Sequence, residues 1–402
     1  MPSSTSSSSG LASRGPEAPG SLAAPRTEAS EGSGAVEAPE AVARLGAYEI
    51  PYIAPPDRPV PAMNVGTAAV TAIVVFVVAL GAWEMHWRQF GSTPSYRNSE
   101  GLWAMQRQRI DRGEGHRTVL IGSSRTLSNI NLDVWERLAG ERPIQLALEG
   151  TSPLRPLEQL AEDEDFTGRL IVGVAPGLFF TGFEYRGAVF DYYEDETLAQ
   201  RAGQRLSMWL VEPYFGFYDP DFALFTVLKR QPWPQREGAP ASMDVRKLFV
   251  SDADRNMRMW RKVETDVGYQ DLAKRIWAQE FHPPDEAQKQ AGAKALDEQL
   301  RRAAVAVEKL KKRGVEVTFV LHPVDGEFAK FELGMLPRAS TWDPLLERTR
   351  ALGVHFQDYP ELQGLTLPEW SHLSAADAEI YTERLYRILE RKRTGASSQA
   401  GR

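Results

Sequence analysis

One stretch of the chain is apolar without interruption. Residues 65–83 contain no charged side chain, and they end in Trp83. A helix of this length spans roughly 28 Å, which matches the hydrocarbon thickness of a bilayer. A buried core helix is the alternative interpretation. The pattern predicts a single transmembrane helix over residues 64–87, with Trp83 and Trp87 as anchors at the far interface.

The residues before this stretch follow a different pattern. Residues 1–60 are dominated by Ser, Gly, Ala, Pro and Glu. A segment with so few apolar side chains does not bury enough surface to offset the entropy of ordering, so we predict a disordered tail. The short segment 48–56 is interpreted either as a docking motif or as a linker with polyproline character.

Residues 98–393 alternate between short apolar runs and amphipathic stretches. Polar turns follow the apolar runs, which is typical of a parallel sheet with helices on both faces. The predicted strands are residues 116–121, 144–148, 169–174, 315–321 and 354–358, and the predicted helices are residues 151–162, 288–312 and 375–391. The sequence therefore predicts one α/β domain, and residues 394–402 are expected to be a disordered C-terminus.

The middle of this domain is less regular. Residues 178–287 are rich in aromatic side chains and show no clear strand–helix alternation. We expect an insertion here. It is interpreted either as a substrate-binding lid or groove or as a packed helical insertion.

The amino-acid composition excludes several kinds of binding and catalytic site. The chain has 47 Lys and Arg against 54 Asp and Glu, a net charge of −7, which argues against a general nucleic-acid binder. It has no cysteine, so disulfides, thiol catalysis and thiolate metal sites are excluded. Its histidines have no recognisable metal-ligand spacing, and there is no phosphate-binding loop. We therefore predict no metal and no cofactor.

The first candidate for chemistry follows the first predicted strand. Gly122 permits a tight turn, and Ser124 would lie at the N-terminus of the next helix. Free N–H groups and the helix dipole stabilise an oxyanion there. Taken alone, the triplet is typical of an ordinary helix cap.

The second candidate precedes the last predicted helix. Glu369 stands three residues before His372. An acid at that position can orient the imidazole, whose other nitrogen then accepts a serine proton. A single histidine at a helix start is more commonly structural.

Together, the two blocks resemble the SGNH (GDSL-like) hydrolase family, and the Gly-Ser-Ser-Arg form is similar to its membrane-anchored DltD-like and alginate-acetylation-like branch. The resemblance implies a flavodoxin-like three-layer α/β/α fold. It also implies that Ser124 is the nucleophile, His372 the general base and Glu369 the orienting acid. Gly150 matches the glycine whose N–H serves the oxyanion hole beside that of Ser124, and Gly122 belongs to the nucleophile block.

The chain departs from the family pattern at several positions. The acid is Glu369 rather than Asp, and Asp358 or Asp325 is an alternative acid. The asparagine that the family uses as an oxyanion donor is absent, because residues 175–177 are Ala-Pro-Gly. Arg125 either contacts an anionic substrate or pairs with a nearby acid.

We therefore expect a membrane-anchored serine esterase or O-acyltransferase that acts on acyl esters of a cell-envelope or exopolysaccharide glycan, or on a small ester, with a membrane-bound partner as acyl donor. A catalytically inactive binding or scaffold protein for polysaccharide assembly is one alternative, and an adaptor that recruits partners through the tail is another. Arginines flank both ends of the span, so charge does not fix its orientation. By analogy with the resembling branch, the expected location is the inner (plasma) membrane with the C-terminal domain outside the cytoplasm.

Overall fold

The structure is a computed structural model that describes residues 64–231, 246–279 and 281–400. The predicted tail, residues 1–60, and the segment 48–56 lie outside the described residues. The chain separates into two units, Met1–Asn64 and Val65–Arg402, and every element below belongs to the second unit.

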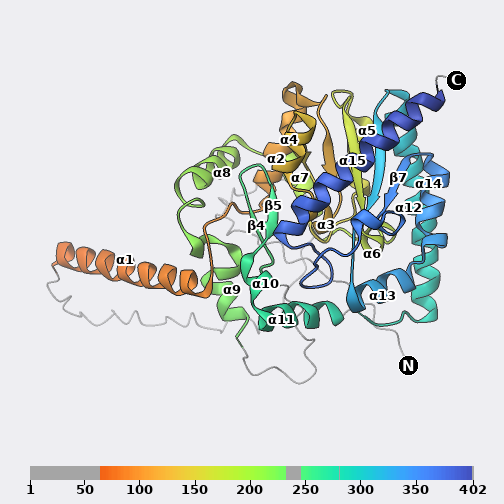
Figure 1. The fold of residues 1–402 in the computed structure, drawn as a ribbon. Helices are drawn as coiled ribbons and strands as arrows, with labels where there is room; N and C mark the ends of the chain where they lie inside the picture. The colour runs from red at the N-terminus through yellow and green to blue at the C-terminus, as the bar shows by residue number, and fades with distance from the viewer. Residues whose placement is uncertain (1–63, 232–245, 280, 401–402) are drawn as a thin grey trace, which may run out of the picture. The chain divides into compact units, whose positions relative to one another are not determined.

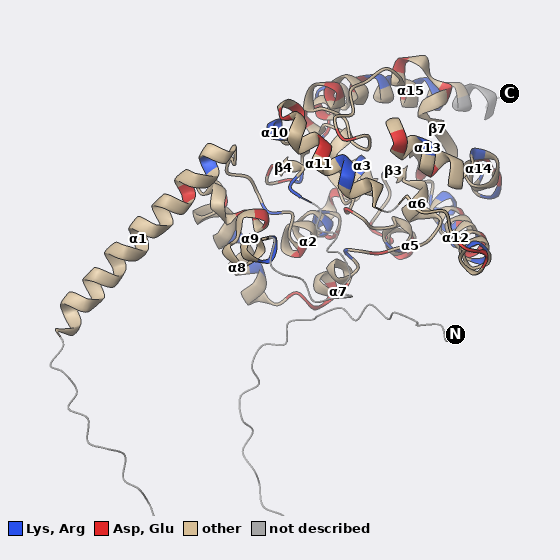
Figure 2. Cartoon of the chain, turned by 90° about the horizontal axis from the view of Figure 1, so that it is seen from below, with Lys and Arg blue, Asp and Glu red and all other residues tan. Residues whose placement is uncertain are grey.

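The apolar stretch forms the helix α1 (Val65–Phe90), which begins one residue after the predicted start and ends three residues after the predicted end. None of its residues is buried, which contradicts the alternative of a core helix. The helix is long and apolar enough to cross a membrane, by length and composition. Figure 2 shows charged residues on α1 only near its C-terminal end.

Five parallel strands form the main sheet. In spatial order they are β2 (Ile144–Gln145), β1 (Val119–Ile121), β3 (Arg169–Val174), β6 (Glu316–Leu321) and β7 (Leu352–His355). After β1 the chain forms β2 on one side of β1 and then crosses to the other side of β1 to form β3. This is the doubly wound order that places a crevice at the reversal, beyond the carboxyl ends of β1 and β3.

The central strands are apolar along their whole length because both faces are covered. Every residue of β1 is buried, and so are five of the six residues of β3. The register places Ile121 beside Val172. The predicted strand 144–148 begins at the expected residue but is shorter, because β2 ends at Gln145. The residues after it continue alongside β1, since Leu146 N–H donates to Leu120 O and Leu148 N–H to Gly122 O.

Two groups of helices cover the sheet (Figure 1). The helix α12 (Glu286–Lys312) packs against α5 (Leu154–Glu162) and α14 (Trp342–Thr349). The helix α15 (Ala375–Ala400) packs against α3 (Ser124–Asn129) and α4 (Leu132–Ala139). Right-handed crossovers place these groups on opposite faces of the sheet. The α/β class with a parallel sheet is thus confirmed.

The ends of the long helices follow local signals. Asp285 caps α12 through a capping box with Gln288, and Gly314, with a φ of +81°, follows its end. The structure differs from the expectation of disorder over residues 394–402, because α15 continues to Ala400; residues 401 and 402 lie outside the described residues. Residues 394–400 contain one glycine, Gly395, and no proline, and their other side chains are compatible with a helix.

The insertion is mainly helical, with one antiparallel hairpin of β4 (Phe249–Ser251) and β5 (Met257–Met259). Part of it packs around a hydrophobic cluster of its own that includes Phe222 and Trp260, as a packed insertion requires. Its helices are α6 (Pro176–Phe179), α7 (Ala188–Asp195), α8 (Leu198–Leu210), η2 (Gly216–Tyr218), η3 (Pro220–Phe222), α9 (Leu224–Lys229), α10 (Arg261–Thr265) and α11 (Val267–Ala278).

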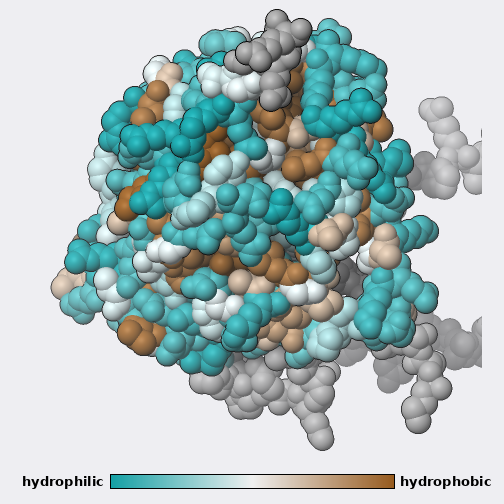
Figure 3. All heavy atoms as spheres, turned by 45° about the vertical axis from the view of Figure 1, so that its right-hand side comes forward, coloured by the Kyte–Doolittle hydropathy of each residue, from teal (hydrophilic) through white to brown (hydrophobic). Residues whose placement is uncertain are grey.

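The remaining elements connect these parts. They are α2 (Glu100–Arg109), the π-helical turn η1 (Ile110–Glu114), α13 (Gly326–Met335), η4 (Arg338–Ser340), η5 (Phe356–Asp358) and η6 (Pro360–Leu362). The face of the domain drawn in Figure 3 is mostly hydrophilic, with apolar atoms visible between the polar side chains.

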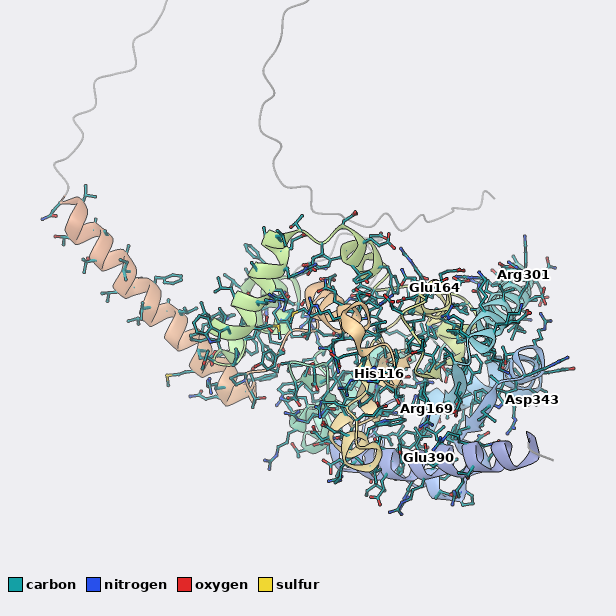
Figure 4. All side chains as sticks on the ribbon, turned by 90° about the horizontal axis from the view of Figure 1, so that it is seen from above. His116, Glu164, Arg169, Arg301, Asp343 and Glu390 are labelled. Carbon is teal, nitrogen blue, oxygen red and sulfur yellow. The ribbon has the colours of Figure 1, made fainter. Side chains whose placement is uncertain are left out.

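Ion pairs fix the amino edge of the sheet. Arg169, which begins β3, donates to Glu390 of α15 at 2.8 Å (Figure 4). His116 precedes β1 and therefore also belongs to this edge. The candidate chemistry lies at the other edge, where the strands end.

Candidate active site

Ser124 is the first residue of α3, directly beyond the carboxyl end of β1. Figure 2 views the molecule from this side, with α3 surrounded by α6, α11, α13 and β4. Ser124 is partly exposed, whereas Ser123 and Arg125 on either side of it are buried. The fold therefore presents one hydroxyl of the Gly-Ser-Ser block to solvent, at the switch point of the sheet.

Gly122 is required by close packing. A Cβ at this position would lie 2.0 Å from Thr126 Oγ1 and 3.2 Å from the Cα of Gly173 on β3. The turn that aims Ser124 out of the sheet thus brings the Gly122 backbone close to the Thr126 side chain and to the backbone of Gly173. The sequence placed Gly122 in the nucleophile block, and the structure shows that its role there is steric.

We expect Gly122→Ala to lower the free energy of unfolding by about 1–3 kcal/mol, since Thr126 must move to admit the methyl group. Urea denaturation of the full chain in detergent checks this. Gly292→Ala is the matched control, because nothing lies within 4 Å of a Cβ there, and it should raise stability slightly. Equal behaviour of the two variants would contradict the packing argument.

Three side chains form a continuous hydrogen-bonded chain. His372 Nε2 lies 2.8 Å from Ser124 Oγ, and His372 Nδ1 lies 2.9 Å from Glu369 Oε1. Both His372 and Glu369 are buried. This is the nucleophile–base–acid order that activates a hydroxyl.

Glu369 is held as an anion. Burial opposes its ionisation, but the charge of His372 and hydrogen bonds from His372 and Trp277 outweigh burial and lower the pKa of the carboxyl. Its Oε1 accepts the His372 backbone N–H at 2.6 Å, and its Oε2 accepts Trp277 Nε1–H at 2.5 Å. An ionised Glu369 accepts from Nδ1–H, so Nε2 is left to accept the Ser124 proton.

The turn between the acid and the histidine is strained. Trp370 has a φ of +75°, a conformation that bulky residues rarely adopt. Its carbonyl accepts the Asp325 N–H at 2.8 Å, which holds the turn against the start of α13. The reversal lets Glu369 reach both the backbone and the ring of His372.

Two aromatic side chains of the insertion enclose the histidine. Phe249 of β4 stands edge-on to the His372 ring at 4.9 Å between centroids, and Trp277 of α11 lies at 6.3 Å. Sequence analysis did not identify either residue as part of the site. The aromatic richness of residues 178–287 was the only signal, and it did not distinguish these two from the others.

Arg125 does not point to an open site. Its guanidinium makes two hydrogen bonds to the Glu332 carboxylate, at 2.7 and 3.1 Å, and Nε donates to Ser371 Oγ at 3.2 Å. Arg125 and Glu332 are both buried. The expectation that Arg125 contacts an anionic substrate is therefore corrected to the alternative, pairing with a nearby acid. The pair ties α3 to α13 beside the His372 turn.

Gly150 lies in the loop after β2 with a φ of +60°. Arg255, which is fully buried, donates to the carbonyls of Gln145 and Ala147, both at 2.7 Å, and so holds this loop in place. Burial, opposed by the charge of Glu149 and assisted by the charge of Arg186, lowers the pKa of Arg255 to about 9. Sequence analysis missed Arg255, since a lone arginine in the insertion carries no motif.

The backbone N–H groups of Ser124 and Gly150 are the expected oxyanion donors. Within the described part of the chain, neither the Ser124 N–H nor the Gly150 N–H donates a hydrogen bond to a protein acceptor. The end of β3 supplies no side-chain donor, because Ala175 leads directly into Pro176 of α6. Residues 175–177 thus supply no side-chain hydrogen-bond donor at the end of β3.

A neutral hydrogen-bonded network contacts α3 through Thr126. His322, at the end of β6, lies 3.0 Å from Thr126 Oγ1 and 2.9 Å from Tyr381 Oη. Burial, with the charges of Arg125 and His372, lowers the pKa of His322 to about 3, so the ring is neutral near pH 7. This histidine is therefore a structural partner of α3.

The alternative acids lie elsewhere. Asp358 pairs with Arg338, and Asp325 caps α13 through the Gly326 N–H. Glu369 is therefore the acid that contacts His372. Among the described residues, no group of three or more His, Asp or Glu side chains is placed to hold a metal ion.

No protein-family model matches the chain, and no curated protein matches it. The functional argument therefore rests on the geometry of the site.

Proposed function

We propose that the protein is a serine esterase or O-acyltransferase in which Ser124 is the nucleophile. The main support for this proposal is the hydrogen-bonded chain in which His372 lies 2.8 Å from Ser124 Oγ and 2.9 Å from Glu369 Oε1. The acid is buried and ionised, the base is buried, and the hydroxyl alone is partly exposed. These are the features that nucleophilic catalysis by serine requires.

The proposed reaction has two steps. Ser124 Oγ attacks the acyl carbonyl carbon while its proton passes to His372 Nε2, and the N–H groups of Ser124 and Gly150 receive the developing oxyanion. The ester C–O bond breaks, and His372 returns the proton to the leaving oxygen. Water or a sugar hydroxyl then attacks the acyl-serine carbonyl carbon and gives its proton to His372 Nε2. The bond between Ser124 Oγ and the acyl carbon breaks, His372 returns the proton to Ser124, and an acid or a new ester is released.

We further propose that α1 anchors this domain to the plasma membrane, outside the cytoplasm, and that its substrates are acyl esters of an envelope or exopolysaccharide glycan. The length and apolar composition of α1 support the anchor. The glycan substrate, the membrane-bound acyl donor and the orientation are supported by the resemblance of the two sequence blocks alone.

A second function is favoured by one observation. The site lacks a side-chain oxyanion donor after β3, and losing one such donor costs about 3 kcal/mol in hydrolases where this has been tested. A binding or scaffold protein that retains the triad geometry without turnover is the resulting candidate.

Ester hydrolysis separates the two candidates. We expect the full chain in detergent to release chromophore from a short-chain nitrophenyl ester, and Ser124→Ala to lower that rate at least about 10³-fold. Ser123→Ala is the matched control, because that hydroxyl is buried and caps nothing, and it should keep most of the activity. Equal rates for the Ser124→Ala variant and the natural chain would refute the esterase.

A further inference from the structure

The helix α8 turns its large apolar side chains away from the domain, whereas an ordinary surface helix turns them toward it. Two of its polar side chains face the domain: Gln204 accepts from Ser99 Oγ at 2.8 Å, and Ser207 Oγ donates to Glu212 at 2.7 Å. Its apolar side chains, spaced at helical intervals, face outward: Leu198 is 80% exposed and Trp209 is 70% exposed. A surface helix in contact with water alone presents the opposite pattern.

The exposed apolar surface continues beyond α8. Phe225, at the start of α9, is 83% exposed. Together the exposed apolar residues of this region form what we call the α8–α9 face: Leu198, Leu206, Trp209, Leu210, Tyr214, Phe215, Leu224, Phe225 and Leu228. A cluster of this size on a water-soluble surface marks a contact with a membrane or another protein.

The α8–α9 face is joined to the C-terminal end of α1. The carboxylate of Glu84 accepts the N–H groups of Gly216 and Phe217, both at 2.9 Å. These two residues lie in η2, which follows directly on Phe215 of the face. Figures 1 and 2 show α9 near this end of α1, and α8 farther from it.

The point of attachment coincides with the end of the apolar run. Trp83, its last residue, donates from Nε1 to the carbonyl of Phe222 at 3.2 Å, and Arg88 donates to the carbonyl of Tyr214 at 2.8 Å. A tryptophan at this position marks the level of the headgroups when the helix spans a bilayer. The domain surface that it touches is then at the same level.

We infer that the α8–α9 face lies in the interfacial region of the bilayer that α1 crosses, with its apolar side chains among the lipid headgroups and upper acyl chains. This inference rests on the proposed membrane anchor but not on the proposed esterase. The exposed cations Arg205 on α8 and Lys229 on α9 fit an anionic lipid surface. The protein is thus held to the membrane at α1 and along the insertion.

The absence of native cysteine provides a direct test. Single cysteines are introduced into the full chain at Ala202 on α8 and at Ala223 beside α9, both exposed, so that every apolar side chain of the face is retained. Ala293→Cys on α12, at the opposite side of the domain in Figures 1 and 2, is the matched exposed control. Val74→Cys reports on α1 itself.

Each variant carries an environment-sensitive dye in nanodiscs of phosphatidylethanolamine and phosphatidylglycerol, with lipids bearing a quencher near the headgroup or deep in the chain. We expect blue-shifted emission at residues 202 and 223 and a large loss of emission with the shallow quencher, consistent with a depth of roughly 5–10 Å. The dye at residue 293 should show neither effect. The dye at residue 74 should respond to the deep quencher.

Other outcomes overturn the inference. If residue 74 is quenched while residues 202 and 223 behave like residue 293, the anchor stands and the interfacial face is refuted. Blue-shifted emission at residues 202 and 223 without lipid quenching shows that protein, such as a second copy of the chain, covers the face. If residue 74 is not quenched, the anchor itself fails. None of these readouts depends on Ser124.

Discussion

Glu369→Gln lowers ester hydrolysis by about 10⁴-fold on this account, because the position accepts three hydrogen bonds and an amide accepts them with one oxygen only. The His372 N–H and Nδ1–H meet at Oε1, and Trp277 Nε1–H meets Oε2. A glutamine must aim its NH2 group at one of these donors. If it faces His372, Nδ1 becomes an acceptor, Nε2 carries the proton, and Ser124 has no base.

The test is the rate constant of ester hydrolysis by the full chain, measured beside its thermal unfolding. Glu369→Asp is the matched control: it keeps the charge with a shorter reach, and we expect it to retain far more activity than the amide. A glutamine variant that folds normally and hydrolyses at the natural rate would contradict the assignment of Glu369 as the orienting acid.

Arg125→Met destabilises the fold by about 3–5 kcal/mol, because it leaves the carboxylate of Glu332 buried without its partner. The two side chains are 3% and 7% exposed, and the guanidinium also stacks over the Phe328 ring at 4.9 Å. Urea denaturation of the full chain in detergent measures the change. The variant should also loosen the contact between α3 and α13 beside the His372 turn.

The double variant with Arg125→Met and Glu332→Met should recover most of the lost stability, because it removes the unpaired charge and fills the space with apolar atoms. A substrate-binding arginine would behave differently. If Arg125→Met left unfolding unchanged and raised KM for an anionic ester alone, the structural assignment would be wrong.

The α/β core was predictable because its signals are local. The run 169–174 becomes β3 without a change of bounds, since a strand buried on both faces is apolar throughout. Gly314 ends α12 as expected, because a left-handed residue is needed there. The contact of Ser124 with His372, 248 residues apart, was predicted from the resemblance of their two sequence blocks to a known family, and not from a local pattern.

The rest of the site depends on tertiary contacts that leave no local pattern. Trp277 and Phe249 are two among many aromatics of the insertion, and only the fold brings them to His372. Arg255 supports the loop of Gly150 from more than a hundred residues away in sequence. The outward stripe of α8 has the spacing of a core-facing helix, and sequence alone does not show which side faces the domain.

The most direct test of the central claim is covalent labelling of the full chain with a fluorophosphonate probe, followed by peptide mass analysis. The account predicts phosphonylation at Ser124, loss of labelling in Ser124→Ala and His372→Ala, and retained labelling in Ser123→Ala. Absence of labelling in the correctly folded natural chain, or labelling that persists in Ser124→Ala, would contradict the assignment of Ser124 as an activated nucleophile.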